Sequence, residues 1–235
     1  MSDSVSAWTV ILAAGSGQRL GFDRPKGFVQ LGGRPMLAWS VEAAAASGSG
    51  IVLVVPPGML DQARPLVTPD VTVIEGGADR QASARLGLAA APSDASVLVV
   101  HDAARPLVPP ELFDRVAAAV ASGSAAGAVP VVPSPDTVKR IRDGRVVETV
   151  PRDDVRLAQT PQAFVSSVLR EVHERAVRDG LAATDDAMLL EAYGHVVGVV
   201  EGSASNFKIT TPEDLDQAER ILAGAPSHPV GGARG

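Results

Sequence analysis

The sequence contains no cysteine among its 235 residues. Disulfide frameworks, thiol nucleophiles and sulfur-ligated zinc sites are therefore excluded. Only four histidines are present, and their scatter along the chain argues against a histidine-rich metal site. Aromatic residues make up 3% of the chain, so we expect no stacking platform for single-stranded nucleic acid. The core must instead be built from Ala, Val, Leu and Ile.

Strong charge and long apolar runs are also missing. The net charge is −6, and an acidic chain repels phosphate backbones, so we expect no nucleic-acid partner. No apolar run reaches the length of a membrane span, and residues 1–7 lack the charged region and apolar core of a signal peptide. We therefore expect a soluble, cytoplasmic protein without membrane contact. The length and the 46% of hydrophobic residues are typical of one large α/β domain.

Short β-branched runs alternate with Ala-rich amphipathic stretches along most of the chain. Continuous apolar runs such as IVLVV and VLVV are typical of strands covered on both faces, as in a parallel sheet. The pattern predicts an α/β fold: a single-domain, Rossmann-like, mostly parallel open sheet with helices on both faces. Strands are predicted over residues 9–12, 51–55, 71–74, 97–100, 128–132, 196–200 and 207–209. Helices are predicted over residues 35–47, 79–91, 110–122 and 163–178, and from Thr211-Pro212 onward.

One segment does not follow this alternation. Residues 137–142 and 145–150 flank Asp143-Gly144, a strong signal for a two-residue hairpin turn. A hairpin inserted into an α/β domain has no place in the sheet, so we expect a projecting β-arm over about residues 134–152. Because two strands alone are unstable in water, a second copy of the chain is the most economical cover, although a hairpin folded back on its own domain is an alternative. We expect the domain to span residues 1–223 and a disordered tail to span residues 224–235.

The segment most informative about function is VILAAGSGQRLGFDRPK, near the amino terminus. A strand runs into a glycine-rich turn, where Gly15 and Gly17 let backbone N–H groups approach a phosphate closely. Leu20 stands where a dinucleotide fingerprint needs its third glycine, and Lys26 lacks the flanking Gly and Ser/Thr of a P-loop. Because Arg19 and Lys26 lie beside the turn, we interpret it as a polyphosphate site rather than as a merely flexible loop.

Extended by PKGFVQLGGRPMLAWSVEA, this segment resembles the signature of nucleotidyltransferases that couple a nucleoside triphosphate to a phosphorylated small molecule. Together with later motifs it resembles the 2-C-methyl-D-erythritol 4-phosphate cytidylyltransferases, a family of the non-mevalonate isoprenoid pathway, over nearly the whole chain. The resemblance implies a fold like that of nucleotide-diphospho-sugar transferases. It also implies transfer of CMP from CTP to methylerythritol phosphate, giving 4-diphosphocytidyl-2-C-methyl-D-erythritol and pyrophosphate. The later motifs are GGADRQAS from Gly76, HDAARP from His101, DTVKR from Asp136, QTPQ from Gln159, TDD from Thr184 and NFKIT from Asn206.

The implied reaction places definite demands on the residues. A phosphate monoester has a second pKa near about 6, so the attacking group is largely ionised at neutral pH and needs no general base. The reaction needs neutralisation of charge, because two anions approach each other and negative charge gathers in the transition state. We therefore predict that Arg19 and Lys26 stabilise the α-phosphate and the transition state. The resemblance assigns Arg152 and Lys208 to holding the incoming phosphate. We also expect Mg2+ or another divalent cation with CTP, its protein ligands being unknown.

The resemblance assigns further binding residues. Asp102 follows an apolar strand and faces either the metal or substrate hydroxyls, and Thr184 is either a substrate contact or a helix N-cap. Thr137 and Arg152 flank the β-arm, so the resemblance implies a homodimer in which they reach the neighbouring subunit's site. The expected nucleotide contacts are Ala13, Ala14, Gly15, Gly17, Gly76, Gly77 and Ser83. The expected polyol phosphate contacts are Asp102, Thr137, Arg152, Thr184 and Lys208.

Two other functions also agree with the sequence. A ribitol 5-phosphate cytidylyltransferase shares nearly all of these motifs. A catalytically silent nucleotide-binding regulator belongs to a different class, and the presence of both Arg19 and Lys26 favours catalysis over it. His101, His173 and His195 are interpreted as structural or surface residues.

Overall fold

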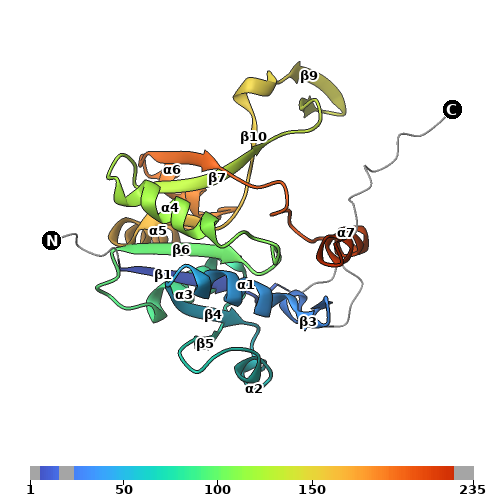
Figure 1. The fold of residues 1–235 in the computed structure, drawn as a ribbon. Coiled ribbons are helices and arrows are strands. Elements are labelled where there is room, and N and C mark those ends of the chain that lie inside the picture. The colour runs from blue at the N-terminus through green and yellow to red at the C-terminus, as the bar shows by residue number, and fades with distance from the viewer. Residues whose placement is uncertain (1–5, 16–23, 225–235) are drawn as a thin grey trace.

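Within residues 6–15 and 24–224, which this computed structural model describes, eight strands form one central sheet (Figure 1). Their order is β10-β7-β11-β6-β1-β4-β5, and β12 also pairs with β7. The strands are β1 (Ala7–Leu12), β4 (Gly50–Val55), β5 (Thr72–Glu75), β6 (Val97–Asp102), β7 (Gly127–Pro133), β10 (Arg156–Ala158), β11 (Gln162–Val165) and β12 (Val197–Glu201).

The central part of the sheet is parallel. β1 pairs in parallel with β4 and β6, β4 with β5, and β12 with β7. β11 is antiparallel to β6 and β7, and β10 is antiparallel to β7. The IVLVV run of β4 is buried throughout, as its lack of polar residues predicts. The prediction of a mostly parallel α/β sheet is confirmed.

Helices cover both faces of the sheet. Ile11 and Leu53 belong to the core cluster under α1 and α4, whereas their neighbours Val10 and Val52 belong to the cluster under α3, α5 and α6. This alternation follows from the two-residue period of a strand. The helices are α1 (Met36–Ala46), α2 (Leu60–Ala63), α3 (Arg80–Ala90), α4 (Glu111–Ala121), α5 (Ser166–Asp179), α6 (Asp186–Ala192) and α7 (Pro212–Leu222), with short 3-10 turns η2 (Lys26–Phe28), η3 (Arg64–Leu66) and η4 (Arg152–Asp154).

A third, smaller core lies beside the end of the sheet. Val29, Leu31 and Met36 pack there with Ile209 and Ala218. This core joins the short hairpin of β2 (Gln30–Leu31) and β3 (Arg34–Pro35) to α7, which lies next to β3 in Figure 1. The segment after Lys26 and the segment after Lys208 are therefore packed against each other.

Helix ends follow the local sequence. The Asp79 side chain accepts a hydrogen bond from the Ala82 N–H at the start of α3, and Thr211 and Asp214 form a capping box at the start of α7. Gly180 ends α5 with a φ of 66°, the left-handed conformation that glycine adopts without a steric penalty. These boundaries agree with the predicted ones.

One predicted strand is absent, and one predicted helix begins later than predicted. Residues 207–209 form no strand, although the Ile209 N–H donates to the Ala104 carbonyl. Residues 163–165 belong to β11, so the helix predicted over residues 163–178 begins only at Ser166. The helix starts late because of a tertiary contact. β11 lies between β6 and β7, where an extended backbone completes the hydrogen-bonded ladder. The helix α6 and strand β10 were not predicted.

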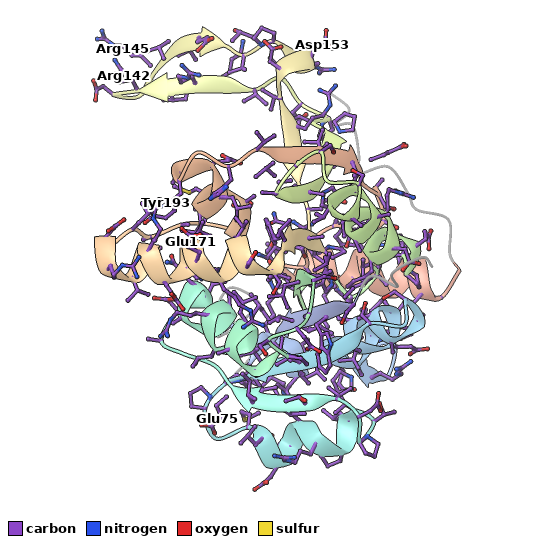
Figure 2. All side chains as sticks on the ribbon, turned by 90° about the vertical axis from the view of Figure 1, so that its left-hand side faces the viewer. Glu75, Arg142, Arg145, Asp153, Glu171 and Tyr193 are labelled. Atoms are coloured by element: carbon purple, nitrogen blue, oxygen red, sulfur yellow. The ribbon has the colours of Figure 1, made fainter. Side chains whose placement is uncertain are left out.

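The predicted hairpin projects from the domain. β8 (Lys139–Arg142) and β9 (Arg145–Thr149) form a separate two-stranded sheet whose residues are all exposed. Asp143 and Gly144 both have positive φ, at 49° and 72°, as a type I′ turn requires. Figure 1 shows this β-arm extending away from the central sheet, and Figure 2 shows Arg142 and Arg145 at its far end. Residues 225–235 of the expected tail lie outside the described residues.

Candidate active site

A pocket of about 460 Å³ opens at the carboxyl ends of β1 and β6. Ligands bind in this position in open α/β sheets, because the loops that follow the strands meet there. Eight of the predicted site residues line the pocket: Ala13, Ala14, Gly15, Lys26, Gly77, Ser83, Asp102 and Lys208. Residues that are distant in sequence are therefore brought to one place.

The glycine-rich turn after β1 forms one wall. The Lys26 N–H donates to the Gly15 carbonyl at 3.1 Å, which ties the two ends of the turn together. A Cβ on Gly27 would lie 2.9 Å from the Ala13 Cβ, so glycine is needed for Lys26 to approach the end of β1 this closely. Gly17 and Arg19 lie outside the described residues, and their roles stay predictions.

The turn between β5 and α3 forms the opposite wall. The Ser83 hydroxyl accepts a hydrogen bond from the Gly77 N–H at 3.1 Å and donates to the Asp79 carbonyl at 2.8 Å. A Cβ on Gly76 would lie 2.7 Å from the Ser83 hydroxyl oxygen. Among the described residues that line the pocket, Gly77 and Ser83 are present and Gly76 is not. Gly76 thus shapes the turn from behind.

Asp102, the last residue of β6, lies between two cations. Its Oδ2 is 2.7 Å from the Lys208 Nζ, and its Oδ1 is 3.3 Å from the Arg80 Nε. Burial alone would raise the pKa of Asp102, but Arg80 and Lys208 outweigh it and hold that pKa well below its ordinary value. The pocket therefore contains an ionised carboxylate held by two positive charges.

Arg80 continues this cluster into the domain. Its NH1 lies 2.9 Å from Asp186 Oδ2, and the other Asp186 oxygen lies 2.9 Å from His173 Nε2. Asp186 and His173 are both buried. Burial would raise the pKa of Asp186, but the charge of Arg80 is the strongest influence that lowers it below its ordinary value. Arg80 stands within the GGADRQAS motif, but no role for it was predicted from the sequence.

Buried hydrogen bonds fix the segment that carries Lys208. The Asn206 side chain is buried, and its Nδ2 donates to the Thr160 carbonyl at 2.8 Å. Directly after Lys208, the Ile209 N–H donates to the Ala104 carbonyl, also at 2.8 Å. The NFKIT motif thus crosses the HDAARP and QTPQ motifs at the mouth of the pocket.

His101 supports the end of β6 from inside the core. Its Nδ1 lies 3.1 Å from the Thr160 hydroxyl, which also accepts a hydrogen bond from the Asp102 N–H. Burial lowers the pKa of His101 to about 4, so the ring is neutral at physiological pH. This agrees with its interpretation as a structural residue.

Three predicted substrate residues do not line the pocket of a single chain. Thr137 and Arg152 are exposed at the base of the β-arm, where the Arg152 NH2 donates to the Pro135 carbonyl. Thr184 is also exposed. The alternative role of Thr184 as an N-cap is wrong, because Asp185 caps α6 by accepting from the Met188 N–H at 3.0 Å.

Comparison with known proteins identifies the family. The family model described as IspD: 2-C-methyl-D-erythritol 4-phosphate cytidylyltransferase matches residues 7–224. This chain belongs to that family. A Frankia casuarinae protein named 2-C-methyl-D-erythritol 4-phosphate cytidylyltransferase is 50% identical over 217 residues, which cover 91% of this chain and 80% of the relative. An Aquifex aeolicus protein of the same name is 43% identical over 213 residues, which cover 91% and 96% of the two chains.

Solved structures of cytidylyltransferases have the same fold. The crystal structure of 2-C-methyl-D-erythritol 4-phosphate cytidylyltransferase from Thermus thermophilus is 39% identical, with a TM-score of 0.75 over 92% of this chain and 98% of the other. The crystal structure of 4-diphosphocytidyl-2C-methyl-D-erythritolsynthase from Anaerococcus prevotii is 30% identical, with a TM-score of 0.81 and the same coverage. The fold prediction is therefore confirmed by sequence and by structure.

The pocket suits a metal ion that arrives with the nucleotide. The described part of the chain has no group of three or more His, Cys, Asp or Glu side chains that could hold a metal ion by itself. Mg2+ usually binds through one or two carboxylates together with substrate phosphates and water. The ionised carboxylate of Asp102 fits this donor set.

Across the described residues 6–15 and 24–224, no helix is both long and apolar enough to cross a membrane.

Proposed function

We propose that this chain transfers CMP from CTP to 2-C-methyl-D-erythritol 4-phosphate, giving 4-diphosphocytidyl-2-C-methyl-D-erythritol and pyrophosphate. Membership of the cytidylyltransferase family, with a match over residues 7–224, is the observation that carries the proposal. The pocket supports it, because it combines a glycine-rich turn, two lysines and an ionised carboxylate at the carboxyl ends of the strands.

The chemistry is an in-line displacement at phosphorus. An oxygen of the polyol phosphate attacks the α-phosphorus of CTP, and the bond from that phosphorus to the bridging oxygen of pyrophosphate breaks. The attacking phosphate is already ionised, so the chain supplies positive charge rather than a general base. Lys26 lines the pocket beside the glycine-rich turn, where it stabilises the α-phosphate. Arg19 has the same predicted role.

Lys208 binds the incoming phosphate. In the structure its Nζ contacts Asp102, and its side chain is 41% exposed, so it can turn toward a substrate anion. Ala13, Ala14 and Gly15 offer backbone N–H groups to the triphosphate, as Gly17 is predicted to do. The turn held by Ser83, with Gly76 and Gly77, takes the cytosine base.

A divalent cation, with Mg2+ as the first choice, accompanies CTP. Asp102 would hold it, and the alternative role of Asp102 is to bind substrate hydroxyls. When bound, such an ion would neutralise negative charge on the triphosphate and on the leaving pyrophosphate. Nucleoside triphosphates are cytoplasmic metabolites, which supports the cytoplasmic location included in this proposal.

The β-arm makes the functional unit a homodimer. Ile141, Val146 and Val147 on the arm are exposed by 56%, 59% and 53%, and unpaired apolar strands are a liability in water. A two-fold dimer with exchanged arms covers them with one self-complementary surface. Thr137 and Arg152, at the base of the arm, then reach the partner's pocket, and Thr184 completes the polyol site.

Release of pyrophosphate tests the proposal. The purified protein is incubated with Mg2+, methylerythritol phosphate and each of CTP, UTP, ATP and GTP, and with CTP alone. We expect release only with CTP and the polyol phosphate together. Binding of CTP without any release would favour the nucleotide-binding regulator instead.

A further inference from the structure

A row of paired polar side chains runs from the pocket into the domain. Lys208, Asp102, Arg80, Asp186 and His173 are each joined to the next by one of the close contacts described above. The exposed fraction of the side chains is 41% at Lys208, at one end of the row, and 1% at Asp186 and His173, at the other. Lys208 therefore lies at the pocket end of the row, and Asp186 and His173 lie buried at the other end.

Arg80 lies in the middle of this row, between Asp102 and Asp186. It is the first residue of α3, directly after the N-cap Asp79, so its backbone is fixed. It reaches two carboxylates through two different nitrogens, Asp102 from Nε and Asp186 from NH1. The planar guanidinium can serve two acceptors in fixed directions, whereas a lysine ammonium is a point charge. Asp186 is held in turn by His173, so Arg80 is oriented from behind.

We propose that Arg80 is a positioning residue for the transfer reaction, which keeps Asp102 oriented and paired when Lys208 leaves that carboxylate for the incoming phosphate. The inference rests on the proposed function, in which Lys208 binds the polyol phosphate. If Lys208 were the sole side chain paired with Asp102, its departure would leave the buried carboxylate without a partner from the protein to orient it, which is costly. With Arg80 in place, one positively charged side chain remains paired with Asp102, and Lys208 is released at a lower free-energy cost.

Steady-state kinetics of Arg80→Gln test this role, with Arg85→Gln as the matched control. Arg85 lies on the same helix, and its side chain is exposed and does not line the pocket. Arg80→Gln should raise the KM for the polyol phosphate and lower kcat, with a loss in kcat/KM of about tenfold or more, while the KM for CTP changes much less. Arg85→Gln should stay within about twofold of the wild type. Equal kinetics for the two variants would overturn the proposal.

A second variant separates positioning from folding. Arg80→Gln alone leaves the buried Asp186 charge without its arginine, which can reduce stability or prevent folding. The variant Arg80→Gln/Asp186→Asn removes both charges. We expect its thermal midpoint to return toward that of the wild type while kcat/KM for the polyol phosphate stays low. Recovery of kcat/KM together with the thermal midpoint would overturn the proposal, because Arg80 would then serve only to neutralise Asp186.

Crystal structures of the substrate-free wild type and of the double variant give a readout that needs no turnover. In the variant, Asp102 should move from the position that contacts both Arg80 and Lys208 and should pair with Lys208 alone. An unchanged Asp102 position would contradict the inference. A wild-type protein that is inactive with CTP and methylerythritol phosphate would instead contradict the proposed function, so the two failures are distinguishable.

Discussion

Lys208 and Asp102 lie 106 positions apart in the sequence, yet the Lys208 Nζ donates a hydrogen bond to Asp102 Oδ2 at 2.7 Å. The contact joins the end of β6 to the segment that leads into α7. It places a lysine where an incoming anion can draw it away from a carboxylate. In the proposed reaction this contact would be exchanged for one between Lys208 and the polyol phosphate.

Lys208→Ala tests the role of this lysine. The variant should raise the KM for the polyol phosphate and also lower kcat, because in the proposed site Lys208 binds that phosphate both before and during transfer. The KM for CTP serves as the internal control and should change little. An increase confined to the KM for CTP would place Lys208 on the nucleotide instead.

Lys26→Ala should act mainly on the chemical step. Loss of one preorganised charge at the transition state costs roughly 3–4 kcal/mol, or about 10²–10³ in kcat. Arg19→Ala should behave in the same way, and Lys26→Arg should keep more activity than Lys26→Ala because the charge remains. Steady-state kinetics with saturating CTP measure the effect. A near-normal kcat for Lys26→Ala would contradict the interpretation of the turn as a phosphate site.

Ser83→Ala should weaken the binding of CTP. The Ser83 hydroxyl joins the Gly77 N–H to the Asp79 carbonyl, and a lost hydrogen bond of this kind costs about 1 kcal/mol, or roughly fivefold in affinity. Ser122→Ala is the matched control, since its hydroxyl donates to the Ala119 carbonyl on the surface. Calorimetry should give a weaker Kd for CTP only in the first variant. Equal Kd values would mean that the turn does not bind the base.

The lowered pKa of His101 predicts that the free energy of unfolding of the metal-free protein depends on pH. Burial lowers its pKa to about 4 in the folded state, against about 6.5 in the unfolded chain. Between these two pKa values the unfolded state binds a proton that the folded state does not. The contribution of the neutral His101 to the free energy of unfolding is therefore complete above about pH 6.5, and it is lost as the pH drops toward 4. The slope is about 1.4 kcal/mol per pH unit. Urea unfolding at about pH 7 and about pH 5 should show this loss in the wild type and a smaller one in His101→Gln. Equal losses would assign the dependence to other groups.

The proposed sharing of active sites between subunits predicts complementation. In a dimer with exchanged arms, a mixture of Arg152→Ala and Lys26→Ala chains leaves one of the two sites of a mixed dimer intact. Activity after subunit exchange should therefore rise above that of either parent. If exchange is demonstrated and activity does not rise, Arg152 acts within its own chain.

Removal of the β-arm tests the same dimer in another way. Replacement of residues 137–150 by a short Gly/Ser linker should yield a monomer with little activity, because the apolar arm and the base that carries Arg152 are lost or displaced. Sedimentation measures the mass, and circular dichroism shows whether the sheet still folds. A folded, fully active monomer would contradict the shared site.

The elements that the sequence predicted well depend on local signals. Buried parallel strands such as β4 are apolar on both faces, Asp143-Gly144 supplies two positive φ values, and Thr211-Pro212 marks the start of a helix. β11 was missed because a short apolar run such as QAFV fits a strand or a helix equally well. The segment forms a strand because it pairs with β6 and β7, and these contacts are distant in sequence.

The pocket was predictable where glycines and lysines stand in a recognisable motif. The roles of Arg80 and Asp186 in this cluster could not be predicted, because charged side chains on helices usually face solvent. Only the folded chain brings Arg80 between Asp102 and Asp186. The sequence left Thr184 as either a substrate contact or an N-cap, and the structure has Asp185 as the N-cap of α6. Both residue types cap helices, so the choice between neighbours depends on a single step in register.

The choice of polyol phosphate is the most direct test of the proposed activity. With CTP and Mg2+ at fixed concentrations, kcat/KM for pyrophosphate release is measured with 2-C-methyl-D-erythritol 4-phosphate and with ribitol 5-phosphate. The methylerythritol phosphate should be turned over far more efficiently. Equal or faster turnover of ribitol 5-phosphate would contradict the proposed function and make this chain a ribitol 5-phosphate cytidylyltransferase.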